Sequence, residues 1–231
     1  MPCRAWHCQA RQSKEGRNIK RGERRQMSEA KVVEIPATEI EVLIVRVRGT
    51  SPLLTHRFIE LSGAKAPKTL SPEKQFQDGL YPCGEGYGLP TVAFKKSIVR
   101  AFKDIQGHDM TTAKQRFFVQ TAPQGDVGAG MTLIETWDEG EGCYVPHGVP
   151  VPFTTSAVNR KTHDRVITTR PMFRDWSAEF LCEHDMRAIP QEIMLAAIQS
   201  SGWGTGVGSW RPECDGEYGR YEIASVQVIQ R

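Results

Sequence analysis

Residues 202–223, GWGTGVGSWRPECDGEYGRYEI, bring together the residue types that proteins use to bind phosphates and bases. Glycine lets backbone N–H groups approach a phosphate because no Cβ atom stands in the way. Arginine side chains can pair with phosphates, and tryptophan and tyrosine rings can stack on bases. Their combination here predicts a surface that binds nucleic acid. The residues concerned are Gly204, Gly206, Gly208, Trp210, Arg211, Gly216, Gly219, Arg220 and Tyr221.

The elements on either side of these glycines argue against a mononucleotide or dinucleotide site. Such sites place their glycines after a strand and before a helix. Here the glycines follow an apolar helical pattern and precede a strand pattern, and no Gly-Lys-Ser/Thr follows them. We therefore expect the loop to contact a polymer. The alternative is structural: Trp203 and Trp210 would pack against a sheet, and Arg211 would pair with Glu213 or another acid.

A second basic cluster lies in residues 159–174, NRKTHDRVITTRPMFR. On a protruding hairpin its cations would form a positive surface for nucleic acid. The alternative is a solvated hairpin whose charges, including those of Asp164 and Asp175, neutralise one another. The basic side chains and the histidine of the cluster are Arg160, Lys161, His163, Arg165, Arg170 and Arg174.

His56 is the best isolated candidate for acid–base chemistry, because imidazole titrates near neutral pH. A lone histidine is more often structural, so we expect a binding protein rather than an enzyme. Cys83, Cys143, His147 and His163 do not follow the spacing of a zinc site, and no serine or cysteine nucleophile motif is present. The sequence therefore predicts neither a metal nor an organic cofactor.

The net charge of +3 over 231 residues comes from the N-terminal segment. Residues 1–26 hold eight basic and two acidic residues, so the remaining chain has 22 basic and 25 acidic residues and a net charge of −3. Residues 1–30 have no helical or strand periodicity, and we expect a disordered basic leader there. One hypothesis is that translation starts at Met27, because the codons for Gly-Glu-Arg just upstream can form a purine-rich ribosome-binding sequence. The alternative is a basic arm that contacts nucleic acid or a partner.

The composition places the protein in a reducing compartment and away from membranes. The six cysteines are scattered, with no C-x-x-C pair, which is typical of free thiols in a cytosolic protein. No apolar run approaches the roughly 20 residues that span a bilayer, and the N-terminus lacks the apolar segment of a secretion signal. We therefore expect a cytoplasmic protein with no membrane partner.

The hydrophobic pattern predicts an α+β fold with six main elements. Their βαββαβ order is typical of a ferredoxin-like domain, in which both helices cover one face of an antiparallel sheet. We expect one such domain over residues 31–231, with a hairpin-containing insertion at 138–173. In another partition, a strand at 131–137 pairs with the strand at 116–121. The six elements are a strand at 38–50, a helix at 89–107, a strand at 116–121, a strand at 175–183, a helix at 190–202 and a strand at 220–230.

The glycine-rich loop between the last helix and the last strand resembles that of the RAMP superfamily (repeat-associated mysterious proteins), the RNA-binding proteins of CRISPR systems. The insertion at 138–173 is similar to the thumb-like hairpin of CRISPR backbone subunits. The blocks VNRKTHDRVITTRPMFRDW and GVGSWRPE are similar to small uncharacterised bacteriophage proteins. The chain departs from the RAMP pattern in the inserted residues WRPECD and in its acidic body. The residues that carry the RAMP resemblance are Gly204, Gly206, Gly208, Gly216, Gly219, Arg220 and Tyr221.

The resemblance implies a loop that approaches an RNA backbone, and a location in the bacterial host cytoplasm if a phage encodes the protein. The leading hypothesis is therefore non-catalytic binding of single-stranded nucleic acid, RNA in preference to DNA, by residues 202–220 and the hairpin at 158–174. One alternative is a phage assembly or inhibitory protein that docks on a host or phage protein. Another is a metal-independent RNA endonuclease. Some RAMP proteins cut RNA through a histidine, and His56 could do so with the RNA 2′-hydroxyl as nucleophile.

Overall fold

The computed structural model describes residues 38–57, 70–122, 130–146, 148–158 and 165–229, all within one unit of the chain, Ala37–Arg231. The fold is α+β, with a mostly antiparallel sheet and four α-helices in the described residues. None of those helices is long and apolar enough to cross a membrane. The predicted leader at 1–30 and the basic residues Arg160, Lys161 and His163 lie outside the described residues.

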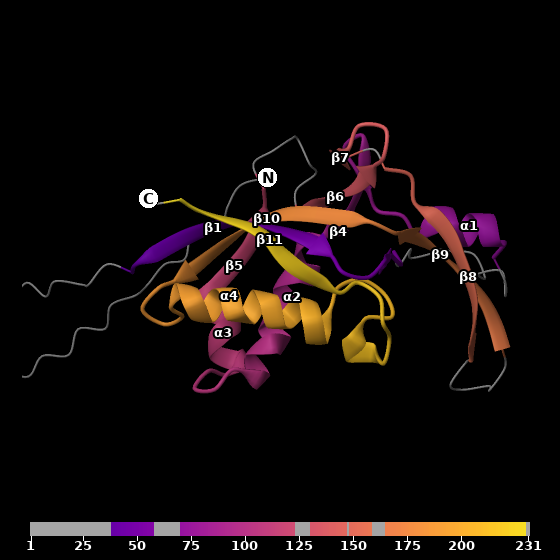
Figure 1. The fold of residues 1–231 in the computed structure, drawn as a ribbon. Coiled ribbons are helices and arrows are strands. Elements are labelled where there is room, and N and C mark those ends of the chain that lie inside the picture. The colour runs from indigo at the N-terminus through magenta and orange to yellow at the C-terminus, as the bar shows by residue number, and fades with distance from the viewer. Residues whose placement is uncertain (1–37, 58–69, 123–129, 147, 159–164, 230–231) are drawn as a thin grey trace, which may run out of the picture. The chain divides into compact units, whose positions relative to one another are not determined.

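Four strands form the centre of the main sheet, in the order β11–β1–β10–β5 (Figure 1). Every neighbouring pair runs antiparallel. The four main strands expected from the hydrophobic pattern are therefore confirmed, and the last strand of the chain lies next to the first. Their bounds are Tyr221–Ile229 for β11, Ile40–Gly49 for β1, Trp176–Asp185 for β10 and Phe117–Thr121 for β5.

Helices α2 (Thr91–Ala101) and α4 (Gln191–Ser200) cover one face of this sheet (Figure 1). Phe94 of α2 packs on Phe180 of β10, with ring centroids 4.9 Å apart, and also contacts Tyr221. All three rings are buried. Burial of large apolar side chains therefore holds the helix against the sheet.

Both predicted helices differ from the structure near their ends. The first ends at Ala101 and continues only as a 3₁₀ turn, Phe102–Asp104. Val92, an apolar residue of its first turn, is 50% exposed. The second helix does not stop at Gly202 but continues as a π-helical turn, Ser201–Thr205.

Two short helices complete the helical part of the described chain. Helix α1 (Pro72–Asp78) begins after Ser71, whose hydroxyl accepts a hydrogen bond from the Lys74 N–H. Helix α3 (Met110–Arg116) was not expected. Asp109 caps it by accepting backbone hydrogen bonds. The sequence MTTAKQR has no apolar stripe, so its hydrophobic pattern does not indicate a helix.

Four further strands extend the main sheet beyond β10. One of them, β6, pairs with the first residues of β10 and also with β4 and β7. Residues 131–137 were expected in one partition to pair with residues 116–121. That partition is wrong, because among the described residues β5 pairs with β10 and not with β6. The bounds are Met131–Asp138 for β6, Gly86–Pro90 for β4, Pro82–Cys83 for β3 and Cys143–Val145 for β7.

The region expected to hold an insertion contains a hairpin of two strands, β8 (Val151–Val158) and β9 (Arg165–Phe173). Strand β9 also pairs with β2 (Leu53–Leu54), which follows β1 in the chain. Strands β2, β9 and β8 together form a small second sheet. Helix α1 lies against β9, where the backbone N–H of Thr169 donates to the side-chain oxygen of Gln75 at 2.7 Å. The hairpin is thus fixed at its base by two separate segments.

Candidate nucleic-acid interface

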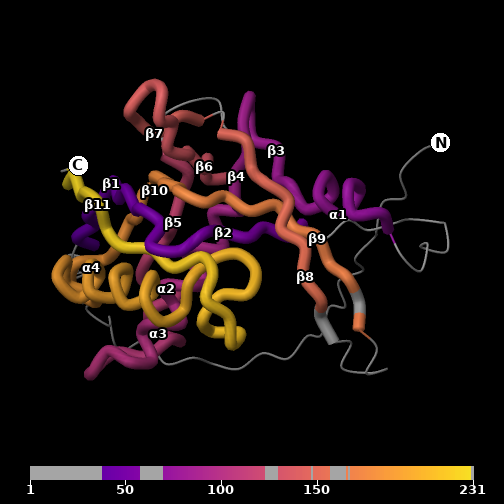
Figure 2. Tube along the Cα trace, turned by 45° about the vertical axis from the view of Figure 1, so that its right-hand side comes forward, coloured from indigo at the N-terminus to yellow at the C-terminus, as the bar shows by residue number. Residues whose placement is uncertain are grey.

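The glycine-rich loop, residues 202–220, lies between the helices and the β8–β9 hairpin, as the yellow segment of Figure 2 shows. Its backbone N–H groups are largely used inside the protein. Val207 donates to the carbonyl of Gly219 at 2.9 Å, and Ser209 donates to the carbonyl of Leu54 at 2.8 Å. These amides cannot also bind a phosphate, so the expected role of the loop amides as phosphate ligands is wrong for them.

Close packing explains most of the glycines in this loop. Gly208 has φ +78°, and a Cβ atom there would lie 2.5 Å from the carbonyl oxygen of Leu54. Gly219 has φ +69°, and a Cβ atom there would overlap the carbonyl oxygen of Val207. Gly208 therefore lets the loop pack against the segment that follows β1, and Gly219 lets the loop pack on itself. Close contacts would also meet a Cβ atom at Gly206 and Gly216.

Tyr221 belongs to the core rather than to a binding surface. Its side chain is 1% exposed, and its hydroxyl lies 2.5 Å from the Ser201 hydroxyl. Burial raises the pKa of Tyr221 to about 12, so the phenol stays protonated at neutral pH. The expectation that this ring contacts nucleic acid is therefore wrong.

Trp203 is the ring of the loop that faces solvent most openly. It lies in the π-helical turn after α4 and is 72% exposed. The guanidinium of Arg220 lies 5.4 Å from the centre of its ring. A Cβ atom at Gly204 would meet nothing within 4 Å, so the space beside Trp203 is open. An exposed ring with an adjacent cation is suited to stacking on a base.

Trp210 joins the glycine-rich loop to the hairpin. Its ring contacts Phe153 of β8 edge to face, at 6.2 Å between centroids, and Tyr218 at 6.3 Å. Arg170 of β9 lies over the same ring at 4.6 Å. The two regions that the sequence nominated for nucleic-acid binding are therefore packed against each other.

The hairpin arginines that the structure describes differ in exposure. Arg165 and Arg174 are exposed. Arg170 is half-buried, and its Nε and Nη1 atoms have no hydrogen-bond partner among the described residues. Burial lowers the pKa of Arg170 from its ordinary value. Both of these atoms are buried, so in this conformation they are closed to an anion, and the guanidinium contacts the Trp210 ring instead.

A cleft of 830 Å³ opens between helix α2 and the glycine-rich loop. Five of the side chains that line it are cationic and one is a carboxylate. We call this hollow the cationic cleft. Such a concentration of positive charge attracts polyanions, even when the chain as a whole has a different net charge. Its charged lining residues are Lys95, Lys96, Arg100, Lys114, Arg211 and Glu213.

The lysines of the cationic cleft come from two helices. Lys95 is half-buried, and its ammonium lies 4.4 Å from the centre of the Phe118 ring. Lys96 of α2 and Lys114 of α3 are exposed, and no ion pair engages either of them within the described part of the chain. Lys96 and Lys114 are therefore available to a ligand.

Arg211 forms an ion pair with Glu213, in agreement with the structural alternative given for this loop. Its Nη2 and Nε atoms lie 2.8 Å and 3.0 Å from one carboxylate oxygen of Glu213. The other oxygen of Glu213 forms an ion pair with Arg100 Nε of α2 at 2.9 Å. The carboxylate therefore links the glycine-rich loop to helix α2 across the cationic cleft.

His56 also lines the cationic cleft, together with Tyr81. Burial and the nearby positive charge of Arg170 lower the pKa of His56 below its ordinary value of 6.5. The imidazole is therefore neutral at pH 7 and could accept a proton but not donate one. It is the one histidine among the described residues that line the cleft. The general acid that a cleavage reaction requires would have to come from a different side chain.

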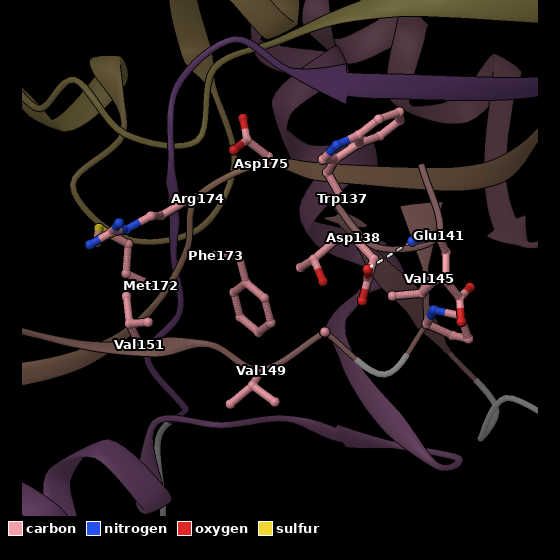
Figure 3. A pocket seen from close by; sticks show the side chains of 13 residues that line it. Trp137, Asp138, Glu141, Val145, Val149, Val151, Met172, Phe173, Arg174 and Asp175 are labelled. Atoms are coloured by element: carbon pink, nitrogen blue, oxygen red, sulfur yellow. Dashed lines mark hydrogen bonds between the residues drawn. The ribbon is translucent and has the colours of Figure 1, made fainter. Parts of the chain in front are cut away.

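A second hollow, of 540 Å³, lies between β6, β7 and the base of the hairpin. Figure 3 shows Trp137, Asp138 and Glu141 on one wall, with Arg174 on the other and Asp175 nearby. Three carboxylates and one arginine line it, and we call this the acidic hollow. Arg174 lines this hollow and does not line the cationic cleft.

The described residues include no group of three or more His, Cys, Asp and Glu side chains that could hold a metal ion. Cys83 is buried and Cys143 is exposed on β7. His147 and His163, the other residues weighed as zinc ligands, lie outside the described residues.

The contribution of helix α2 to the cleft was not predicted from the sequence. Lys95, Lys96 and Arg100 line the cationic cleft from this helix. Their neighbour in space is the glycine-rich loop, because the Ser97 hydroxyl on α2 donates to the Ser201 carbonyl at 3.4 Å. The signal available in the sequence was three cations on the part of the helix away from its apolar stripe.

No family model matches the chain, and no curated protein matches it. One solved structure that the chain matches is a chain from a type III-B Cmr-beta complex, determined by cryo-EM bound to cognate target RNA. The two chains are 12% identical, with a TM-score of 0.44. The match covers 83% of this chain and 61% of the other, so it spans about three fifths of the neighbour's length.

Proposed function

We propose that this protein binds single-stranded nucleic acid, RNA in preference to DNA, along the cationic cleft without catalysing a reaction. The observation that carries the proposal is the lining of the cleft, in which five cations face one carboxylate. Lys96 and Lys114 supply exposed charge for phosphates. Trp203, with Arg220 beside it, supplies a stacking surface in the adjoining loop. The preference for RNA rests on the resemblance of the loop to RAMP proteins.

We further propose that the unit is a ferredoxin-like domain of RAMP type, encoded by a phage and acting in the host cytoplasm. The strand order β11–β1–β10–β5 supports the ferredoxin-like assignment, as does the position of α2 and α4 on one face. The hairpin packed against the glycine-rich loop supports the comparison with a thumb-like hairpin. Arg160 and Lys161 of the hairpin belong to the same proposed set of cations, and they lie outside the described residues.

Binding can be tested with the full-length chain and a fluorescein-labelled RNA of mixed sequence, about 20 nucleotides long, by fluorescence anisotropy. We expect tight binding at about 50 mM salt and a steep loss of affinity by about 200 mM, because phosphate contacts release counterions. The matching DNA tests the preference for RNA. If neither polymer shifts the anisotropy at low salt, the proposal is contradicted, and a search for a co-purifying protein would follow.

The same samples test the endonuclease alternative. RNA recovered after incubation in EDTA should remain intact, since neutral His56 has no histidine partner among the described residues of the cleft. Fragments that appear with the wild type and vanish with His56→Ala would show that the protein cuts RNA.

A further inference from the structure

The carboxylate of Glu213 occupies a position between two guanidinium groups. Arg100 Nε contacts one of its oxygens at 2.9 Å, and Arg211 contacts the other through two nitrogens, at 2.8 Å and 3.0 Å. Each oxygen thus has its own arginine. Guanidinium groups bind carboxylates and phosphates with the same planar fork, so two converging arginines suit the two unesterified oxygens of a phosphodiester equally well.

We propose that Arg100 and Arg211 form a phosphodiester-binding site, and that Glu213 fills it when no nucleic acid is bound. This inference rests on the proposed function of the cationic cleft and adds a control element to it. All three side chains line the cleft. Their side chains are 57%, 34% and 25% exposed, in the order Arg100, Arg211 and Glu213, so a polymer can reach them without unfolding of the loop.

The loop can release Glu213 while it retains Arg211. Arg211 Nη1 also donates to the carbonyl of Gly208 at 3.2 Å, a contact that does not involve Glu213. Glu213 lies in the 3₁₀ turn Pro212–Cys214, which has a left-handed non-glycine residue close by on each side. These residues are Trp210, with φ 52°, and Asp215, with φ 59°. Left-handed backbone is unfavourable for a bulky residue such as tryptophan, and such backbone is concentrated at switch segments and ligand clamps.

A resident carboxylate changes which ligands the cleft accepts. An incoming phosphate must break two arginine–carboxylate contacts before it forms its own. An isolated anion therefore gains little binding free energy in the cleft. A polymer that also contacts Lys96, Lys114 and the exposed Trp203 gains enough elsewhere to displace Glu213. Glu213 is therefore expected to weaken binding of every ligand and to favour long strands over short ones.

The variant Glu213→Gln removes the competing charge and keeps the side-chain shape. We expect it to bind the labelled RNA about three- to tenfold more tightly than the wild type, since two partly exposed ion pairs no longer need to be broken. Glu217→Gln is the matched control. Glu217 is exposed in the same loop, and the substitution changes the net charge equally, but it does not line the cleft. We expect less than about a twofold effect from it. Thermal unfolding of each variant checks that the fold is retained.

The variant Arg100→Gln tests whether Arg100 and Arg211 hold Glu213 together. In that background we expect Glu213→Gln to give a smaller gain than in the wild type, because one of the two contacts is already absent. Equal affinities of the Glu213→Gln and Glu217→Gln proteins, with wild-type binding intact, would overturn the inference and leave the proposed function standing. Weaker binding by Glu213→Gln would also overturn it, because Glu213 would then hold the arginines in place for the ligand. Absence of binding by all the proteins would overturn both proposals.

Discussion

The cationic cleft and the acidic hollow are comparable openings with opposite charge. The cleft has a volume of 830 Å³, with five cations and Glu213 as its carboxylate. The hollow has a volume of 540 Å³, with three carboxylates and Arg174 as its cation. An exposed tryptophan lies in the acidic hollow and another close to the cleft: Trp137 is 47% exposed and Trp203 is 72% exposed.

The comparison teaches that the average charge of this chain says little about what it binds. Residues 27–231 have a net charge of −3, yet the fold gathers cations from α2, α3 and the glycine-rich loop on one side. A phosphate polymer should enter the cleft and be repelled by the hollow. Paired substitutions in the cleft and in the hollow test this contrast.

Reversing charge in the cleft should have the largest effect. The double variant Lys96→Glu/Lys114→Glu replaces the two exposed, unpaired lysines with acids, and we expect an affinity loss for RNA of about 100-fold at low salt. Lys103→Glu is the control, since Lys103 is exposed next to α2 but does not line the cleft. Fluorescence anisotropy measures both, and similar losses in the two proteins would contradict the assignment of the cleft.

Alanine variants of the two exposed tryptophans should differ by about tenfold in their affinity for RNA. Trp203→Ala removes a stacking surface, and loss of one base–aromatic stack weakens binding by about 1–3 kcal/mol. Trp137→Ala removes another exposed ring, in the acidic hollow, and should leave RNA affinity unchanged. Anisotropy titrations of both variants test this prediction, which fails if Trp137→Ala weakens binding as much as Trp203→Ala.

Acid should strengthen binding modestly through His56. Its pKa is lowered by burial and by Arg170, so the imidazole gains its charge only below about pH 6.5. Protonation adds a cation to the cleft, so we expect wild-type affinity to rise about two- to threefold between pH 7.5 and 5.5. The same titration with His56→Gln should show a smaller rise, and an equal rise would assign the effect to other groups.

A substitution in the acidic hollow should change stability but not binding. Asp138 accepts hydrogen bonds from the backbone N–H groups of Gly140 and Glu141, at 2.7 Å and 3.1 Å. Asp138→Ala should therefore lower the free energy of unfolding by about 0.5–1 kcal/mol. We expect its RNA affinity to stay within about twofold of the wild type, because long-range charge effects are screened. Denaturant unfolding and anisotropy measure the two quantities, and a large change in affinity would show that the hollow contacts RNA.

Much of the fold could be predicted from hydrophobic periodicity. The four central strands and helices α2 and α4 follow it, since each buries one apolar face or stripe. Strands β3 and β4 were missed because Pro82, Gly86, Gly88 and Pro90 are typical of loops, and these strands depend on pairing with each other and with β6. The π-helical turn was missed because Gly202 is a usual stop signal. In the structure Gly202 packs against Tyr221, and the local sequence does not encode this tertiary contact.

The candidate site was less predictable. Composition nominated the glycine-rich loop and the hairpin, which the structure places in contact, but it could not show that Tyr221 is a core residue. Whether Arg211 was free or paired depended on the 3₁₀ turn that brings Glu213 back to it. The cationic cleft exists only because α2 packs beside the loop, so its lysines become a site through tertiary structure alone.

The most direct test of the cationic cleft uses two exposed thiols as reporters. Cys214 lies beside Glu213 in the turn Pro212–Cys214, and Cys143 lies on β7 beside the acidic hollow. Cys83 and Cys182 are buried, and burial raises the pKa of Cys182 to about 12, so both should react slowly.

In full-length protein with Cys3→Ser and Cys8→Ser, the rate of alkylation by iodoacetamide can be followed for each thiol by peptide mass spectrometry. Saturating RNA should slow modification of Cys214 by at least about fivefold and leave Cys143 within about twofold of its rate without RNA. Equal rates at Cys214 with and without bound RNA, or protection of Cys143 instead, would contradict binding in the cationic cleft.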